Sequence, residues 1–99
     1  MYKQLVYHSL AIKDLRESMA FYEDNETDLG FRFEKSVKEK IAAILNHPER
    51  YAKRRGHYRE TILKDFPFLI VYRYNKMKQQ ITIASIFHTS RNPKYKYRR

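Results

Sequence analysis

The sequence predicts an α+β fold in the order β-α-α-β-β-β, with a helical hairpin packed on a small, twisted, mainly antiparallel sheet. Hydrophobic residues recur with helical spacing between residues 11 and 45 and with a period of two after residue 57. The 99-residue chain is too short for two ordinary domains, so one domain over residues 1–99 is expected. Its 42% hydrophobic content, with nine Tyr and six Phe, can fill a compact core.

The first part of the chain predicts a strand followed by a helix. Residues 2–8 (YKQLVYH) favour a strand, whose pairing partner the sequence leaves open. Ser9 is the expected N-cap of the helix. The expected buried stripe of this helix has spacings of three and four: Ile12, Leu15, Met19 and Tyr22.

A second helix should follow the acidic, turn-prone segment 24–28 (DNETD), with Thr27 or Asp28 as its cap. Its expected buried stripe is Phe33, Val37, Ile41 and Ile44. The helix should stop at 46–48 (NHP), because the residue before proline avoids the helical region. The short loop between the helices predicts an antiparallel hairpin.

The second half of the chain predicts three strands after a basic connection at 49–57 (ERYAKRRGH). The strands are residues 58–64 (YRETILK), 68–74 (FLIVYRY) and 80–88 (QITIASIFH). Their short turns permit only antiparallel neighbours, so a meander is expected.

The charge is distributed unevenly along the chain. Residues 1–50 hold eight Lys and Arg and nine Asp and Glu, a net charge of −1, whereas residues 51–99 hold thirteen and two, a net charge of +11. No acidic residue follows Asp65. A basic half favours a negatively charged partner, such as nucleic acid or an acidic protein segment.

Residue usage also narrows the chemistry. The absence of Cys excludes disulfides, thiolate zinc sites and cysteine nucleophiles. With two Gly in all, neither of the glycine-rich phosphate-binding motifs GxGxxG and GxxxxGK[ST] occurs. The four histidines do not have the spacing of metal ligands. We therefore expect no metal and no other cofactor. The N-terminus lacks the apolar region of a secretory signal and no apolar run reaches about 18 residues, so we expect a cytoplasmic protein with no membrane partner.

Candidates for catalysis lie around the end of the last strand. His88 can act as a general acid or base, because histidine titrates near neutrality. RNA cleavage also needs cations around the phosphate, a role for Arg91 or Arg59. If the protein is a ribonuclease, these three residues are the expected catalytic set; a structural histidine at a strand end is the alternative.

Cations interleaved with aromatic residues suit nucleic acid, because bases stack on Tyr and phosphates pair with Arg. The expected target-binding residues follow this pattern in the strands and in the basic tail, residues 89–99: Arg59, Arg73, Arg91, Lys94, Tyr95 and Tyr97. A frayed basic terminus is the alternative for the tail. Arg73 shares a strand face with Leu69 and Val71, so it must snorkel or pair if the helices cover that face.

Several short motifs occur in a fixed order along nearly the whole chain. They are Asp14-Leu15, Leu29-Gly30-x-Arg32-Phe33, Pro48 with Tyr51, Tyr58-Arg59, Phe66-Pro67-Phe68, Tyr72-Arg73 and His88-x-x-Arg91-Asn92-Pro93. Together they resemble the RelE/ParE superfamily of toxins from type II toxin–antitoxin modules, and most closely its ParE-like, plasmid-stabilisation branch.

The resemblance implies a small cytoplasmic toxin with the fold given above. It also implies a cognate antitoxin whose acidic, amphipathic segment wraps the toxin and silences it. ParE-like members block DNA gyrase, whereas RelE-like members cut messenger RNA on the ribosome with basic residues and an acid/base side chain.

Two departures from the ribonuclease pattern favour the first activity. In related ribonucleases an arginine commonly opens the strand that here reads Phe68-Leu69-Ile70-Val71, and a glutamate base precedes the meander; neither has a clear counterpart here. We therefore expect a ParE-like gyrase inhibitor. A RelE-like, ribosome-dependent mRNA endoribonuclease is the first alternative, and a non-toxic nucleic-acid-binding module is the second.

Overall fold

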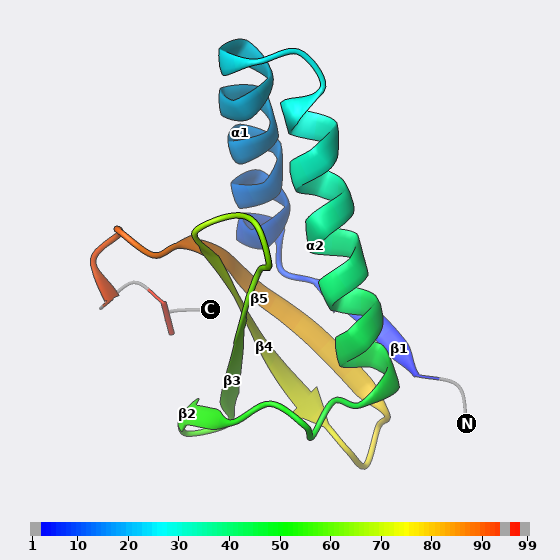
Figure 1. Ribbon diagram of the computed structural model, residues 1–99. Coiled ribbons are helices and arrows are strands. Elements are labelled where there is room, and N and C mark those ends of the chain that lie inside the picture. Colours follow the sequence, from blue (N-terminus) through cyan, green and yellow to red (C-terminus); the bar gives the residue numbers. More distant parts are fainter. Residues whose placement is uncertain (1–2, 94–95, 98–99) are drawn as a thin grey trace.

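The computed structural model describes residues 3–93 and 96–97 and shows a helical hairpin standing on a twisted sheet (Figure 1). The elements are β1 (Gln4–Tyr7), α1 (Ser9–Asn25), α2 (Leu29–Asn46), β2 (Lys53–Arg55), β3 (Tyr58–Ile62), β4 (Phe68–Asn75) and β5 (Gln80–His88). The strand order is β1-β5-β4-β3-β2, with β1 parallel to β5 and all other pairs antiparallel. The predicted α+β fold with a mainly antiparallel sheet is confirmed.

The partner of the first strand is β5. The register runs from Gln4 opposite Gln80 to Tyr7 opposite Ile83, and the helical hairpin forms the crossover that a parallel pair requires. Because β1 ends at Tyr7, the last residues of β5 have no strand neighbour on that side. Helix α1 occupies this place instead.

The basic connection expected at residues 49–57 contains a short strand that the sequence analysis missed. β2 pairs with β3, with Lys53 opposite Arg59 and Arg55 opposite Tyr58. Three consecutive cations lack the alternation of a half-buried strand, but charge suits an exposed edge because it discourages pairing with other chains. β3 also ends earlier than expected, at Ile62.

The predicted cap was wrong at α1, whereas at α2 the cap position, Asp28, is one of the two predicted. At α1 the cap is His8 rather than Ser9, and the His8 Nδ1 atom accepts a hydrogen bond from the Leu10 amide at 3.1 Å. At α2 the cap residue is Asp28, but its backbone is left-handed (φ 70°) and its side chain caps nothing. The carboxylate of Glu23 accepts the Asp28 and Gly30 amides instead, at 2.9 and 3.0 Å.

Gly30 allows the two helices to approach closely. A Cβ atom at this position would lie 2.7 Å from the Met19 carbonyl oxygen in α1, which is backbone and cannot swing aside. The glycine of the Leu29-Gly30 motif is therefore a packing requirement of the hairpin.

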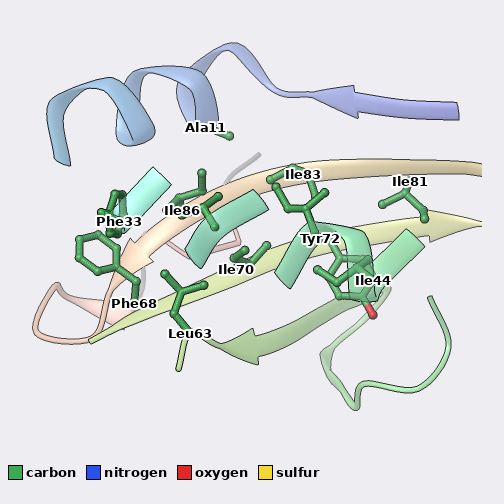
Figure 2. Close-up of a cluster of buried hydrophobic side chains, with 12 residues drawn as sticks. Ala11, Phe33, Ile44, Leu63, Phe68, Ile70, Tyr72, Ile81, Ile83 and Ile86 are labelled. Atoms are coloured by element: carbon green, nitrogen blue, oxygen red, sulfur yellow. The ribbon is translucent and has the colours of Figure 1, made fainter. Parts of the chain in front are cut away.

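The core lies between the helices and one face of the sheet, and Figure 2 shows side chains from both helices and from the strands gathered in one cluster. Its buried members are Ala11, Phe33, Val37, Ile41, Ile44, Leu63, Phe68, Ile70, Tyr72, Ile81, Ile83 and Ile86. The predicted stripe of α2 is confirmed. The stripe of α1 was wrong at its first position, because Ala11 is fully buried whereas Ile12 is 36% exposed.

A bulge in β5 explains why its buried isoleucines do not alternate regularly. Val71 lies opposite Ser85, but the next residue, Tyr72, lies opposite Ile83, so Ala84 is the extra residue. Because of this shift, both Ile83 and Ile86 reach the helical layer.

Candidate functional site

The end of β5 and the turn after it position two of the predicted catalytic residues. His88 lies opposite Phe68, and their rings meet edge to face at 4.9 Å between centroids. The His88 Nδ1 atom accepts the Ser90 amide at 3.0 Å and lies 2.7 Å from the Ser90 hydroxyl oxygen. Since this amide occupies the Nδ1 lone pair, the neutral ring carries its proton on Nε2. In that state His88 is a hydrogen-bond donor.

Arg91 is held beside the same strand end by α1. Its Nη1 atom lies 3.6 Å from the Asp14 Oδ1 atom, and its guanidinium lies 4.9 Å from the centre of the Phe87 ring. The cation therefore has a carboxylate and an aromatic ring as neighbours before any ligand arrives.

Asp14 fills the place that β1 leaves open. Its Oδ2 atom accepts the Ile86 amide at 3.1 Å and the Ser85 hydroxyl at 3.4 Å, and its side chain is only 9% exposed. A helix side chain thus satisfies the edge of β5 where no strand can.

These groups surround a surface hollow of about 320 Å³, which we call the β5-end hollow. Its lining includes Asp14, Glu17, Phe21, Phe68, His88 and Arg91. One imidazole, one arginine and two carboxylates on a mostly aromatic floor can bind a polar or amphipathic group.

Arg59, the third predicted catalytic residue, does not join them. Its Nη1 atom donates to the backbone carbonyls of Glu49 and Tyr51, at 3.1 and 2.6 Å. It lies opposite Tyr72 in the register, four residues along β4 from the partner of His88, a separation of roughly 13 Å along the strand. Its guanidinium anchors the loop after α2.

Tyr72 also anchors the loop after α2. Its hydroxyl donates to the Pro48 carbonyl at 2.7 Å. Burial raises the pKa of Tyr72 to about 12, and the nearby Arg59 opposes part of that rise. Tyr72 of the Tyr72-Arg73 motif and Arg59 of the Tyr58-Arg59 motif therefore both anchor the loop after α2.

Arg73 lies on the sheet face away from the helices. Its guanidinium lies 5.7 Å from the centre of the Tyr58 ring, directly opposite in the register. Its Nε atom is buried and has no hydrogen-bond partner within residues 3–93 and 96–97.

The basic tail packs on this same face where the structure describes it. Lys96 Nζ lies 3.2 Å from each carboxylate oxygen of Glu60, and the Tyr97 hydroxyl donates to Glu60. The Tyr97 ring lies 5.2 Å from the Tyr58 ring. Burial, followed by the hydrogen bond and the negative charge of Glu60, raises the pKa of Tyr97 to about 12.

At Lys96 and Tyr97 the tail thus contacts the sheet face. The predicted target-binding residues Lys94 and Tyr95 lie outside the described residues.

Within the described ranges, no group of three His, Cys, Asp or Glu residues could hold a metal ion, and no helix is long and apolar enough to cross a membrane.

Sequence reasoning missed two carboxylates that organise these regions. Asp14 lies in one of the recurring motifs, but the expected buried stripe of α1 did not include it. Glu60 is one of only two acids in residues 51–99, and that scarcity was the available signal, because a tail of cations has few carboxylates to bind.

Comparison with known proteins gives a consistent family. The model of one protein family, described as ParE toxin of the type II toxin–antitoxin system parDE, matches residues 5–93. No curated protein matches in sequence.

Solved structures share the fold at low identity. The chromosomal ParDE system of P. aeruginosa matches with a TM-score of 0.77 at 16% identity, over 89% of this chain and 97% of the other. The isolated E. coli RelE toxin matches with a TM-score of 0.69 at 18% identity, over 95% and 92%. A chain of the intact E. coli RelBE toxin–antitoxin complex gives 0.69 at 17% identity, over 91% and 100%.

Proposed function

Because the chain belongs to the ParE toxin family of type II toxin–antitoxin systems, we propose that it arrests growth by inhibiting DNA gyrase and that a cognate antitoxin neutralises it. The family match over residues 5–93 is the observation that carries this proposal. The proposed target places its action in the cytoplasm.

The arrangement of the candidate catalytic residues supports inhibition by binding rather than by cleavage. The Nδ1 lone pair of His88 is occupied by the Ser90 amide, and Arg91 has Asp14 as a neighbour. Arg59 is tied to loop carbonyls and lies away from both. RNA cleavage needs a base, an acid and a cation converging on one phosphate.

Charge and exposed aromatic residues support an acidic, amphipathic antitoxin segment as the partner. The chain carries a net charge of +10. On the helical hairpin, Phe21 and Phe31 are 63% and 67% exposed, which suits the apolar side of such a segment. The E. coli RelBE complex provides a precedent for a toxin of this fold bound to its antitoxin.

Supercoiling of relaxed plasmid by purified gyrase tests the proposal. We expect supercoiling to fall as the purified chain is added and to recover when an antitoxin encoded beside the toxin gene is included. Undiminished supercoiling at a large molar excess of the chain would remove gyrase as the target.

One observation favours ribosome-dependent mRNA cleavage as the second candidate function, namely that His88 and Arg91 line one hollow. Toeprinting of translated message would then show new cuts that vanish in His88→Ala and Arg91→Ala. Cuts that survive both substitutions would refute these two roles. Normal growth after induction, together with salt-sensitive nucleic-acid binding, would favour a non-toxic module over both activities.

A further inference from the structure

A second hollow, separate from the β5-end hollow, lies at the β4–β5 hairpin on the sheet face away from the helices. It has a volume of about 470 Å³, and we call it the hairpin hollow. Its polar lining is His57, Arg73, Asn75, Lys76, Gln80 and Thr82. None of its lining residues is acidic.

The sheet register explains why these side chains meet. Arg73 of β4 lies directly opposite Thr82 of β5, and Asn75 lies opposite Gln80. Directly opposite residues place their Cβ atoms about 5 Å apart on one face. Residues 73 and 75 therefore point to the same side as their partners, and the turn that contains His57 lies beside them in the lining.

The positive charge of Arg73 is uncompensated within the part of the chain that the structure describes. The described ion pairs of this region join Lys76 to Glu49 and Lys96 to Glu60, and none includes Arg73. Glu60, the acid nearest along the sheet, is already occupied by Lys96 and Tyr97.

The Nε atom of Arg73 is moreover buried without an acceptor. A buried donor that lacks a partner is costly, although Arg73 as a whole is only partly buried. The Tyr58 ring supports the guanidinium from one side, which fixes its direction but supplies no oxygen acceptor.

We propose that the hairpin hollow binds a phosphate group, with Arg73 as the residue that carries the charge. The planar guanidinium matches two phosphate oxygens. The Thr82 hydroxyl, the Gln80 amide and the His57 imidazole supply further donors around a tetrahedral anion. The hollow is much larger than a phosphate ion, so the natural ligand is a phosphate ester with additional substituents. This site is independent of whether gyrase is the target.

Side-chain NMR tests the site directly, because the Arg73 Nε–H group is shielded from water and should give its own signal. Inorganic phosphate is titrated into the purified full-length chain, and the chloride concentration is lowered in step so that the ionic strength stays constant. A titration with chloride alone is the control. We expect saturable shifts of the Arg73 Nε–H signal and of the Gln80 and Thr82 amides.

Variants make the test specific. Arg73→Gln should weaken phosphate binding by about tenfold or more, whereas Arg54→Gln, which removes one exposed cation from β2, should change it less than about twofold. Thr82→Val keeps the side-chain shape and should weaken binding a few-fold, and it decides the matter if Arg73→Gln does not fold.

Two further probes identify the source of the phosphate. Adenosine monophosphate offers a monoester, and a short single-stranded oligonucleotide with hydroxyl ends offers only diesters; binding of either at Arg73 supports the proposal and assigns the ligand type. Shifts no larger than those caused by chloride, or binding that Arg73→Gln and Thr82→Val leave unchanged, would overturn it.

Discussion

Replacing Asp14 with alanine should destabilise the fold through the edge of β5. The substitution leaves the Ile86 amide, now bonded at 3.1 Å, without an acceptor in a place that α1 covers. Loss of a hydrogen bond to a charged group at a site only 9% exposed costs about 2–3 kcal/mol. The ion pair with the 43% exposed Arg91 adds little, because solvent screens it.

Urea unfolding monitored by circular dichroism measures this loss in the free energy of unfolding. In thermal unfolding the melting temperature should fall by about 10–20 °C for a domain of this size. Asp14→Asn keeps one acceptor oxygen and should lose only about 1 kcal/mol. Asp24→Ala removes an exposed carboxylate from the same helix and serves as the matched control. Equal stability of Asp14→Ala and Asp24→Ala would refute the assignment of Asp14 to the strand edge.

Three further outcomes are expected. Gly30→Ala should lower the free energy of unfolding by about 1–2 kcal/mol in urea, because the new methyl group meets the Met19 carbonyl and outweighs the better helix propensity; an increase in stability would contradict the close helix contact. Tyr72→Phe should lose about 1–2 kcal/mol, because its hydroxyl bonds a loop carbonyl in a buried place, and a neutral result would show that water replaces this bond. The folded state holds the phenolic protons of Tyr72 and Tyr97 up to a pKa of about 12, against 10.0 for an ordinary tyrosine, so stability should fall as the pH rises from about 10 to about 12. Absorbance at alkaline pH should show late ionisation that decreases in Tyr97→Phe, and ionisation of every tyrosine near pH 10 would contradict both assignments.

Most of the fold could be predicted because the periodicity of hydrophobic residues is a local signal. The stripe of α2 and the full extent of β5 were correct, since a half-buried helix and a central strand each impose their own spacing. The exposed edge strand β2 has no buried face, so its three cations carry no such signal. The parallel pairing of β1 depends on contacts more than 70 residues away along the chain, which spacing cannot specify.

The candidate site was predictable only where its residues are close in sequence. His88 and Arg91 are three residues apart around one turn, so a single strand end presents both. The role of Arg59 could not be predicted, because it depends on where the backbone carbonyls of the loop after α2 lie. Every residue has a carbonyl, so the sequence does not indicate which ones accept. Asp14 lies outside the hydrophobic stripe expected for α1, and its role could not be predicted because the strand edge that it satisfies is formed by the far end of the chain.

Gyrase inhibition and mRNA cleavage can be separated in a single culture that expresses the toxin briefly without its antitoxin. Plasmid topology on chloroquine gels and message integrity by primer extension are measured in the same samples, soon after induction. A gyrase inhibitor should relax the plasmid while messages remain intact. Normal supercoiling with newly cut messages would contradict the proposed function.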